Sequence, residues 1–224
     1  MTAFTTEKID VEPWFDMELF MGVSQETRLG GDVMDRFMTL WKNWLPHLTV
    51  KGIDTGKIKY LLVALDESVE QDVDKAWEGS PSNAFLYNAL AQTMCMAAVH
   101  AVIPEVQDAG CAPAPKPTAT LREALEAEGI PYSNDKDPIL SRRYAVVTHY
   151  PFKGGCEICV LQSNCPKGQG QMEATSVVLP GYEHPQQMGC YEIGGEEREP
   201  FPSPLSLSLQ RLSTGGEAAW RAFV

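Results

Sequence analysis

The stretch 81–103 reads PSNAFLYNALAQTMCMAAVHAVI and is apolar almost all the way round a helical projection. A helix without a polar face has to be buried, either in a protein core or in a membrane. Asn88, Gln92 and His100 interrupt the apolar run, and Pro104 stops it, which favours a core helix over a membrane span. We therefore expect this helix to be the central element of an N-terminal helical domain.

Other helices are predicted around it. Between Asp32, placed as an N-cap, and Pro46, apolar residues recur at three- and four-residue steps. The same periodicity runs over 57–77 before Gly79, with the acidic residues mostly off the apolar face. A less regular apolar run over 5–23 predicts a short helix that starts near residue 13. Together with 81–103, these segments predict a helical bundle over residues 1–106.

The composition changes after that bundle. Residues 107–118 carry prolines at alternate positions, Pro113, Pro115 and Pro117, which enforce an extended linker. Thr120 and Glu123 then form a capping-box pattern that opens a short helix. After this helix the pattern becomes extended.

Three short strands are predicted, over 144–150, 174–179 and 189–193. The sequence therefore predicts an α+β fold, mainly α. A smaller α/β domain over 119–224 would follow the linker and hold a cysteine-rich loop between short antiparallel strands.

Charge and composition exclude some functions. The chain has 18 Lys and Arg against 30 Asp and Glu, a net charge of −12, which disfavours binding to nucleic acid or to an anionic membrane. The first twenty residues lack the basic start and apolar run of a signal peptide. We expect a cytoplasmic protein, where six cysteines serve as ligands or free thiols more often than as disulfides.

Three cysteines lie close together as C-x2-C-x5-C: Cys156, Cys159 and Cys165. Gly154-Gly155 precedes them and Pro166 follows, so the backbone can bend tightly enough for three sulfurs to converge. This arrangement predicts a metal centre. The five-residue spacing and the lack of a second C-x2-C pair favour a [4Fe–4S] cluster over structural zinc, which is the alternative.

A fourth ligand is needed to complete either centre. Cys190 is the first candidate, because a strand returning from Pro180-Gly181 would carry it back to the loop. Cys111 in the linker and His149 are the alternatives. Around the loop, Arg142, Arg143, Lys153 and Lys167 outnumber Glu157, and this local positive charge suits an anionic cluster.

With His149 in first place, the pattern His-x6-Cys-x2-Cys-x5-Cys over 149–165 resembles the C-x6-C-x2-C-x5-C cluster loop of the endonuclease III type of DNA glycosylase. The Cys165-Pro166 pair is also similar to the ending of the bacterial ferredoxin motif. These resemblances imply an iron–sulfur cluster. They do not extend to glycosylase activity, because no helix-hairpin-helix with a catalytic Asp is found upstream.

The expected function is that of an accessory or electron-transfer protein with an iron–sulfur cluster. Two alternatives stay open: a zinc-stabilised protein–protein interaction module, and a cluster-containing enzyme. For an enzyme the acid–base candidates near the loop are His149, Glu157, Tyr150 and His184, whose spacing specifies no substrate.

A protein partner is also expected. The acidic face formed by Asp66, Glu70 and Asp74 could bind a basic protein, although a solvated helix face is the commoner role of such a run.

Overall fold

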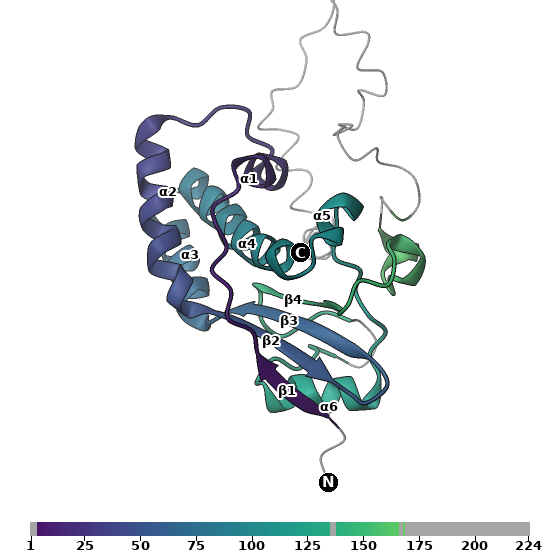
Figure 1. Ribbon diagram of the computed structural model, residues 1–224. Coiled ribbons are helices and arrows are strands. Elements are labelled where there is room, and N and C mark those ends of the chain that lie inside the picture. The colour runs from purple at the N-terminus through teal and green to yellow at the C-terminus, as the bar shows by residue number, and fades with distance from the viewer. Residues whose placement is uncertain (1–3, 135–137, 166–167, 169–224) are drawn as a thin grey trace, which may run out of the picture.

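The computed structural model describes residues 4–134, 138–165 and 168. They form one four-stranded antiparallel sheet with helices on both faces (Figure 1). The strands are β1 (Thr5–Lys8), β2 (Leu48–Asp54), β3 (Lys59–Leu65) and β4 (Ala145–His149), in the order β1-β2-β3-β4. The α-helices are α1 (Met17–Ser24), α2 (Gly31–Trp44), α3 (Glu67–Gly79), α4 (Pro81–Val102), α5 (Glu105–Ala109) and α6 (Ala119–Ala127). Short 3₁₀ turns are η1 (Leu45–His47), η2 (Cys156–Ile158) and η3 (Gln162–Asn164).

β3 is buried on both faces, because its side chains alternate between two hydrophobic clusters. Leu61, Val63 and Leu65 belong to the larger cluster, on the face covered by α1 to α5 (Figure 1). Tyr60, Leu62 and Ala64 belong to the smaller cluster, which α6 covers from the opposite face (Figure 1). β3 therefore joins the two cores.

α4 is the central helix of the larger core, as predicted. Eleven of its side chains are buried, including Leu90, Met94 and Val99. Ser80 caps its start by accepting a hydrogen bond from the Asn83 amide, and Pro81 occupies the first turn. By length and composition α4 could cross a membrane, but 56% of its apolar window is buried within the fold, as in the core helix of a globular domain.

The expected α+β class is confirmed, as are the helices over 32–46 and 81–103, the helix after the linker and the strand near 144–150. The helix after the linker begins slightly earlier than expected, because Thr118 and not Thr120 is its N-cap. The strands predicted over 174–179 and 189–193 lie outside the described residues. The part of the predicted cysteine-rich loop that follows Cys165, apart from Gly168, also lies outside them.

The helix predicted over 57–77 is wrong in its first half. Residues 59–65 form β3, Asp66 ends the strand, and α3 begins at Glu67. The run KYLLVAL is apolar because it is a strand buried on both faces, and such a run matches helical spacing by chance. The short helix expected within 5–23 exists only as α1, because residues 5–8 form β1.

The helical bundle predicted over 1–106 is therefore wrong, since β1, β2 and β3 all lie within it. The predicted division of the chain at 107–118 also does not separate two folding units in the described part. β3 comes before that segment and β4 after it, yet the two pair in register, for example Leu62 with Val147. Long-range strand pairing of this kind leaves no local signal in the sequence.

Because β3 supplies both cores, we expect changes on either of its faces to destabilise the whole fold. Leu61→Ala and Leu62→Ala should each lower the free energy of unfolding by about 2–5 kcal/mol, measured by denaturant titration with circular dichroism. Met38→Ala, at a side chain that is 40% exposed, is the control and should change stability by roughly 0.5 kcal/mol or less. A Leu62→Ala variant as stable as the parent would contradict a shared core strand.

Candidate functional site

The three predicted thiols lie on a loop that follows β4, which we call the thiol loop (residues 154–165). Its backbone folds as successive i→i+3 turns. The Cys159 amide donates to the Cys156 carbonyl at 3.2 Å, and the Cys165 amide donates to the Gln162 carbonyl at 3.4 Å. Between these turns, the Gln162 amide donates to the Cys159 carbonyl at 3.1 Å. All three cysteines are partly exposed.

Gly154 and Gly155 open the thiol loop in a way that depends on Gly154 having no side chain. Gly154 has φ +140°, and a Cβ there would collide with the Glu157 carboxylate. That carboxylate accepts a hydrogen bond of 2.9 Å from the Gly155 amide. The Gly155 N–H group is therefore bound to Glu157.

Among the described residues, one backbone hydrogen bond attaches the thiol loop to the rest of the fold. The Val160 amide donates to the Ala114 carbonyl at 3.0 Å. The neighbouring Pro113 carbonyl accepts a hydrogen bond of 3.0 Å from the buried Thr148 hydroxyl of β4. The segment that carries Cys111 is thus fixed between β4 and the thiol loop, three residues from the anchor at Ala114.

The other predicted ligands lie in different surroundings. His149 is on the opposite face of β4 from Thr148, because successive side chains of a strand alternate. Its ring packs on Tyr60, with centroids 5.4 Å apart, and its Nδ1 is buried with no hydrogen-bond partner among the described residues. Burial, followed by the positive charge of Lys153, lowers the pKa of His149. Cys190, the first candidate, and the enzyme candidate His184 lie outside the described residues.

Within the described ranges, no group of three or more His, Cys, Asp or Glu side chains is placed to hold one metal ion. The thiols share one loop and one set of turns, but they do not converge there on a single point. The local positive charge is also smaller than expected. Arg143 makes a two-pronged ion pair with Asp74, at 2.6 and 3.2 Å, and Arg142 lies 3.8 Å from Glu70.

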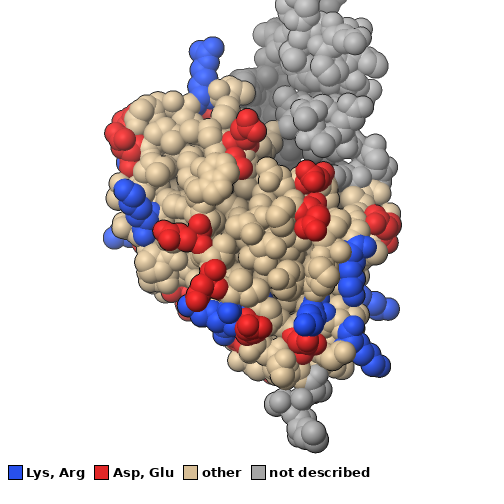
Figure 2. All heavy atoms as spheres, viewed as in Figure 1, with Lys and Arg blue, Asp and Glu red and all other residues tan. Residues whose placement is uncertain are grey.

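These pairings also bear on the expected partner surface. Glu70 accepts a hydrogen bond of 2.9 Å from the Arg143 amide, in addition to its contact with Arg142. Asp74 is held by Arg143, and Asp66 by His47 and Ser68. Each of the three carboxylates is thus already used within the chain, and the predicted docking of a basic protein gains no support from their placement. Acidic and basic side chains are interspersed over the face seen in Figure 2.

Cys95 of α4 differs from the thiols of the loop. It is fully buried, and its S–H donates to the Tyr144 carbonyl at 3.6 Å. Burial raises the pKa of the Cys95 thiol to about 12. A thiol that stays protonated is neither a nucleophile nor a metal ligand, so Cys95 is a core residue, and it provides an internal control for the reactive thiols.

A Ser–His–Asp cluster that was not predicted from the sequence lies where β3 meets α3. Asp66 Oδ2 lies 2.6 Å from His47 Nδ1, and the Ser68 hydroxyl lies 3.2 Å from the same nitrogen. In a nucleophilic triad the serine and the carboxylate contact different ring nitrogens, so this cluster lacks the relay geometry. It serves as a helix cap, because Asp66 also accepts from the Ser68 amide at 2.8 Å. The signal that was overlooked is an Asp directly after an apolar run, a typical N-cap position.

The pKa of Asp66 has opposing causes. Burial raises it, but hydrogen bonds from Ser68 and His47 lower it, and the net pKa lies below the ordinary value of 3.8. A carboxylate with a depressed pKa stabilises the fold above its unfolded pKa, and this contribution disappears as the pH falls through the folded value.

We therefore expect Asp66→Ala to lower stability by about 0.5–2 kcal/mol at pH 7, the usual effect of removing an N-cap. The difference between parent and variant should stay constant from pH 7 to about 5 and shrink below about pH 4, as the parent's carboxyl is protonated. Denaturant titration across this range measures it. A difference that disappears already at pH 6 would contradict the lowered pKa of Asp66.

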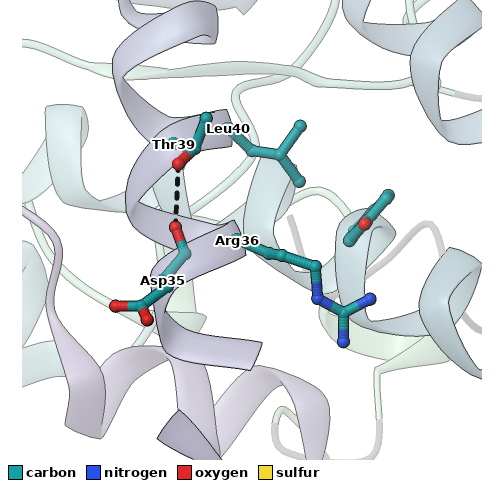
Figure 3. A pocket seen from close by; sticks show the side chains of 5 residues that line it. Asp35, Arg36, Thr39 and Leu40 are labelled. Carbon is teal, nitrogen blue, oxygen red and sulfur yellow. Dashed lines mark hydrogen bonds between the residues drawn. The ribbon is translucent and has the colours of Figure 1, made fainter. Parts of the chain in front are cut away.

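A shallow groove of about 340 Å³ lies between α2 and α4 (Figure 3). Asp35, Arg36, Thr39 and Leu40 of α2 line it together with Tyr87 of α4. The Thr39 hydroxyl donates to the backbone carbonyl of Asp35, and Arg36 reaches Asn83 at 3.4 Å. The groove holds no thiol or histidine and is widely open to solvent, so it offers neither a nucleophile nor an enclosed site.

Comparison of the chain with protein-family profiles, with curated proteins and with solved structures finds no match.

Proposed function

We propose that the chain is a metal-binding accessory or electron-transfer protein, and that Cys156, Cys159 and Cys165 hold a [4Fe–4S] cluster. The observation that carries the proposal is the contrast between the order of the thiol loop and its burial. The loop is built of consecutive hydrogen-bonded turns, yet none of residues 150–165 is buried. Apolar packing therefore contributes little to its shape.

Coordination of a metal would supply the stabilisation that the loop does not obtain from a core. A metal centre cross-links its ligands, and in small loops its binding free energy is coupled to folding. The lack of a converged group of three ligands among the described residues is compatible with this coupling, because a metal draws the ligands of such a loop together as it binds. Closing the loop onto a cluster then requires rotations within 156–165 while Val160 stays attached to Ala114.

The position of the loop suits electron transfer. All three thiols are partly exposed, so a cluster held by them would lie near the surface, where a redox partner can approach it. An iron–sulfur cluster supplies one-electron chemistry. The role of this chain would be to hold the cluster on the loop that follows β4, supported by the sheet.

Zinc is the second candidate, and the same loop favours it. A structural zinc ion stabilises small elements that cannot bury a core, which describes residues 150–165. The protein would then be an interaction module and not a redox protein. The identity of the bound metal distinguishes these two functions.

We expect anaerobically purified, reconstituted chain to contain iron and sulfide and to show the broad visible absorption of a cluster. Cys156→Ser combined with Cys159→Ser should remove both, whereas Cys95→Ala, at a buried cysteine outside the loop, should keep them. Metal and sulfide analysis with absorption spectroscopy measures this. One zinc and no iron per chain would support the interaction module, and parent protein with neither metal would refute both proposals.

Single substitutions decide the fourth ligand. Cys190→Ser, Cys111→Ser and His149→Gln are each compared for cluster content. The segment that carries Cys111 lies beside the thiol loop, because Val160 donates to Ala114. Thr148 of β4 donates to the same segment, at Pro113. His149 is on the opposite face of β4 from Thr148 and so points away from that segment. Cluster loss in one variant alone identifies the ligand.

A further inference from the structure

The turn that joins Cys156 to Cys159 has a backbone conformation that is compatible with a disulfide between them. The Cys159 amide binds the Cys156 carbonyl, and η2 spans the residues between them. In a 3₁₀ turn each residue advances about 2.0 Å, so residues three apart have Cα atoms about 6 Å apart. Disulfides join Cα atoms roughly 4.4–6.8 Å apart. The pair can therefore be bridged by side-chain rotation and small adjustments of the turn.

Turn geometry disfavours the other pairs within the thiol loop, and burial removes Cys95 from consideration. The turn that ends at Cys165 begins at Gln162, so the residue across that turn is not a cysteine. Cys159 and Cys165 are separated by two successive turns with Gln162 between them. Cys95 is buried in α4 and its thiol stays protonated at neutral pH. Cys156 and Cys159 are the two thiols that a single turn brings together, and both are partly exposed to a reagent.

We propose that Cys156 and Cys159 form a redox-active dithiol that closes to a disulfide and thereby controls metal binding by the thiol loop. The control of metal binding rests on the function proposed above, whereas formation of the disulfide does not. The oxidant is a low-molecular-weight disulfide. The sulfur of one cysteine attacks this oxidant, forms a mixed disulfide and releases one small thiol. The sulfur of the second cysteine then attacks the mixed disulfide and releases the second small thiol. The two protein thiols together lose two electrons and two protons, which the two small thiols take up.

The oxidised turn cannot provide two thiolates, so the disulfide and the metal centre exclude each other. Bound metal protects the dithiol, and oxidation prevents metal uptake. The exposed position of the loop, which the metal centre shares, makes the dithiol accessible to the oxidant.

The test uses the metal-free full chain treated with oxidised glutathione, followed by alkylation of the remaining thiols and mass spectrometry. Before alkylation the oxidised chain should be lighter than the reduced chain by two hydrogen atoms, about 2 Da, and after alkylation it should carry two fewer alkyl groups. Trypsin should release 154–167, which contains all three thiols of the loop, and cleavage after Glu157 separates Cys156 from the other two. The two pieces should stay linked until a reductant is added.

Matched variants locate the bond. Cys165→Ser should keep the link between the pieces and Cys159→Ser should lose it, while Cys95 is neither oxidised nor alkylated in the folded chain. A link between Cys156 and Cys165, or mixed disulfides with glutathione alone, would overturn the assignment.

Metal-loaded and metal-free chains are then compared in the same reaction. Loss of the link in the metal-loaded chain supports the control of metal binding. An equal yield of the link in both would overturn it, even if metal binding itself stands. A chain that forms the link but takes up neither iron nor zinc would refute the proposed function and the control, and would leave the dithiol itself supported.

Discussion

The pairing of β3 with β4 is the interaction on which the rest of the described structure depends. β3 is buried on both faces. It pairs with β4, the edge strand of the described sheet, at five positions from Tyr60–His149 to Ala64–Ala145. The helix that covers the smaller core, α6, lies between the two strands in the sequence. Where β4 ends, the chain continues directly into the thiol loop. The location of the candidate site therefore follows from the way the sheet is completed.

Electrostatic pairing has a local role that the net charge of −12 conceals. The carboxylates of α3 hold Arg142 and Arg143 immediately before β4, and Asp72 accepts a hydrogen bond of 2.8 Å from the Trp44 indole. Lys51 of β2 pairs with Glu128 at the end of α6. Opposite charges thus connect elements that are far apart in the sequence. An acidic composition is consequently no measure of an acidic docking surface.

Local patterns in the sequence were sufficient for the elements with strong period and cap signals. α2 and α4 are examples, since their apolar spacing and the flanking Pro46 and Pro104 indicate their extent. β3 was misassigned because a strand buried on both faces has no polar alternation to distinguish it from a helix. The thiol loop could be named from its spacing, but its attachment to Ala114 and the opposite placement of His149 depend on strand pairing over long distances.

The thiol loop is held on the sheet through its contact with the linker segment, and the amide of Val160 reports on this attachment directly. In native-state hydrogen exchange followed residue by residue, the Val160 amide should exchange much more slowly than the same amide in a free peptide, because it donates to the Ala114 carbonyl. Exchange of the Val160 amide at the free-peptide rate, while the amides of β4 remain protected, would contradict this attachment and show that the loop is detached from the sheet.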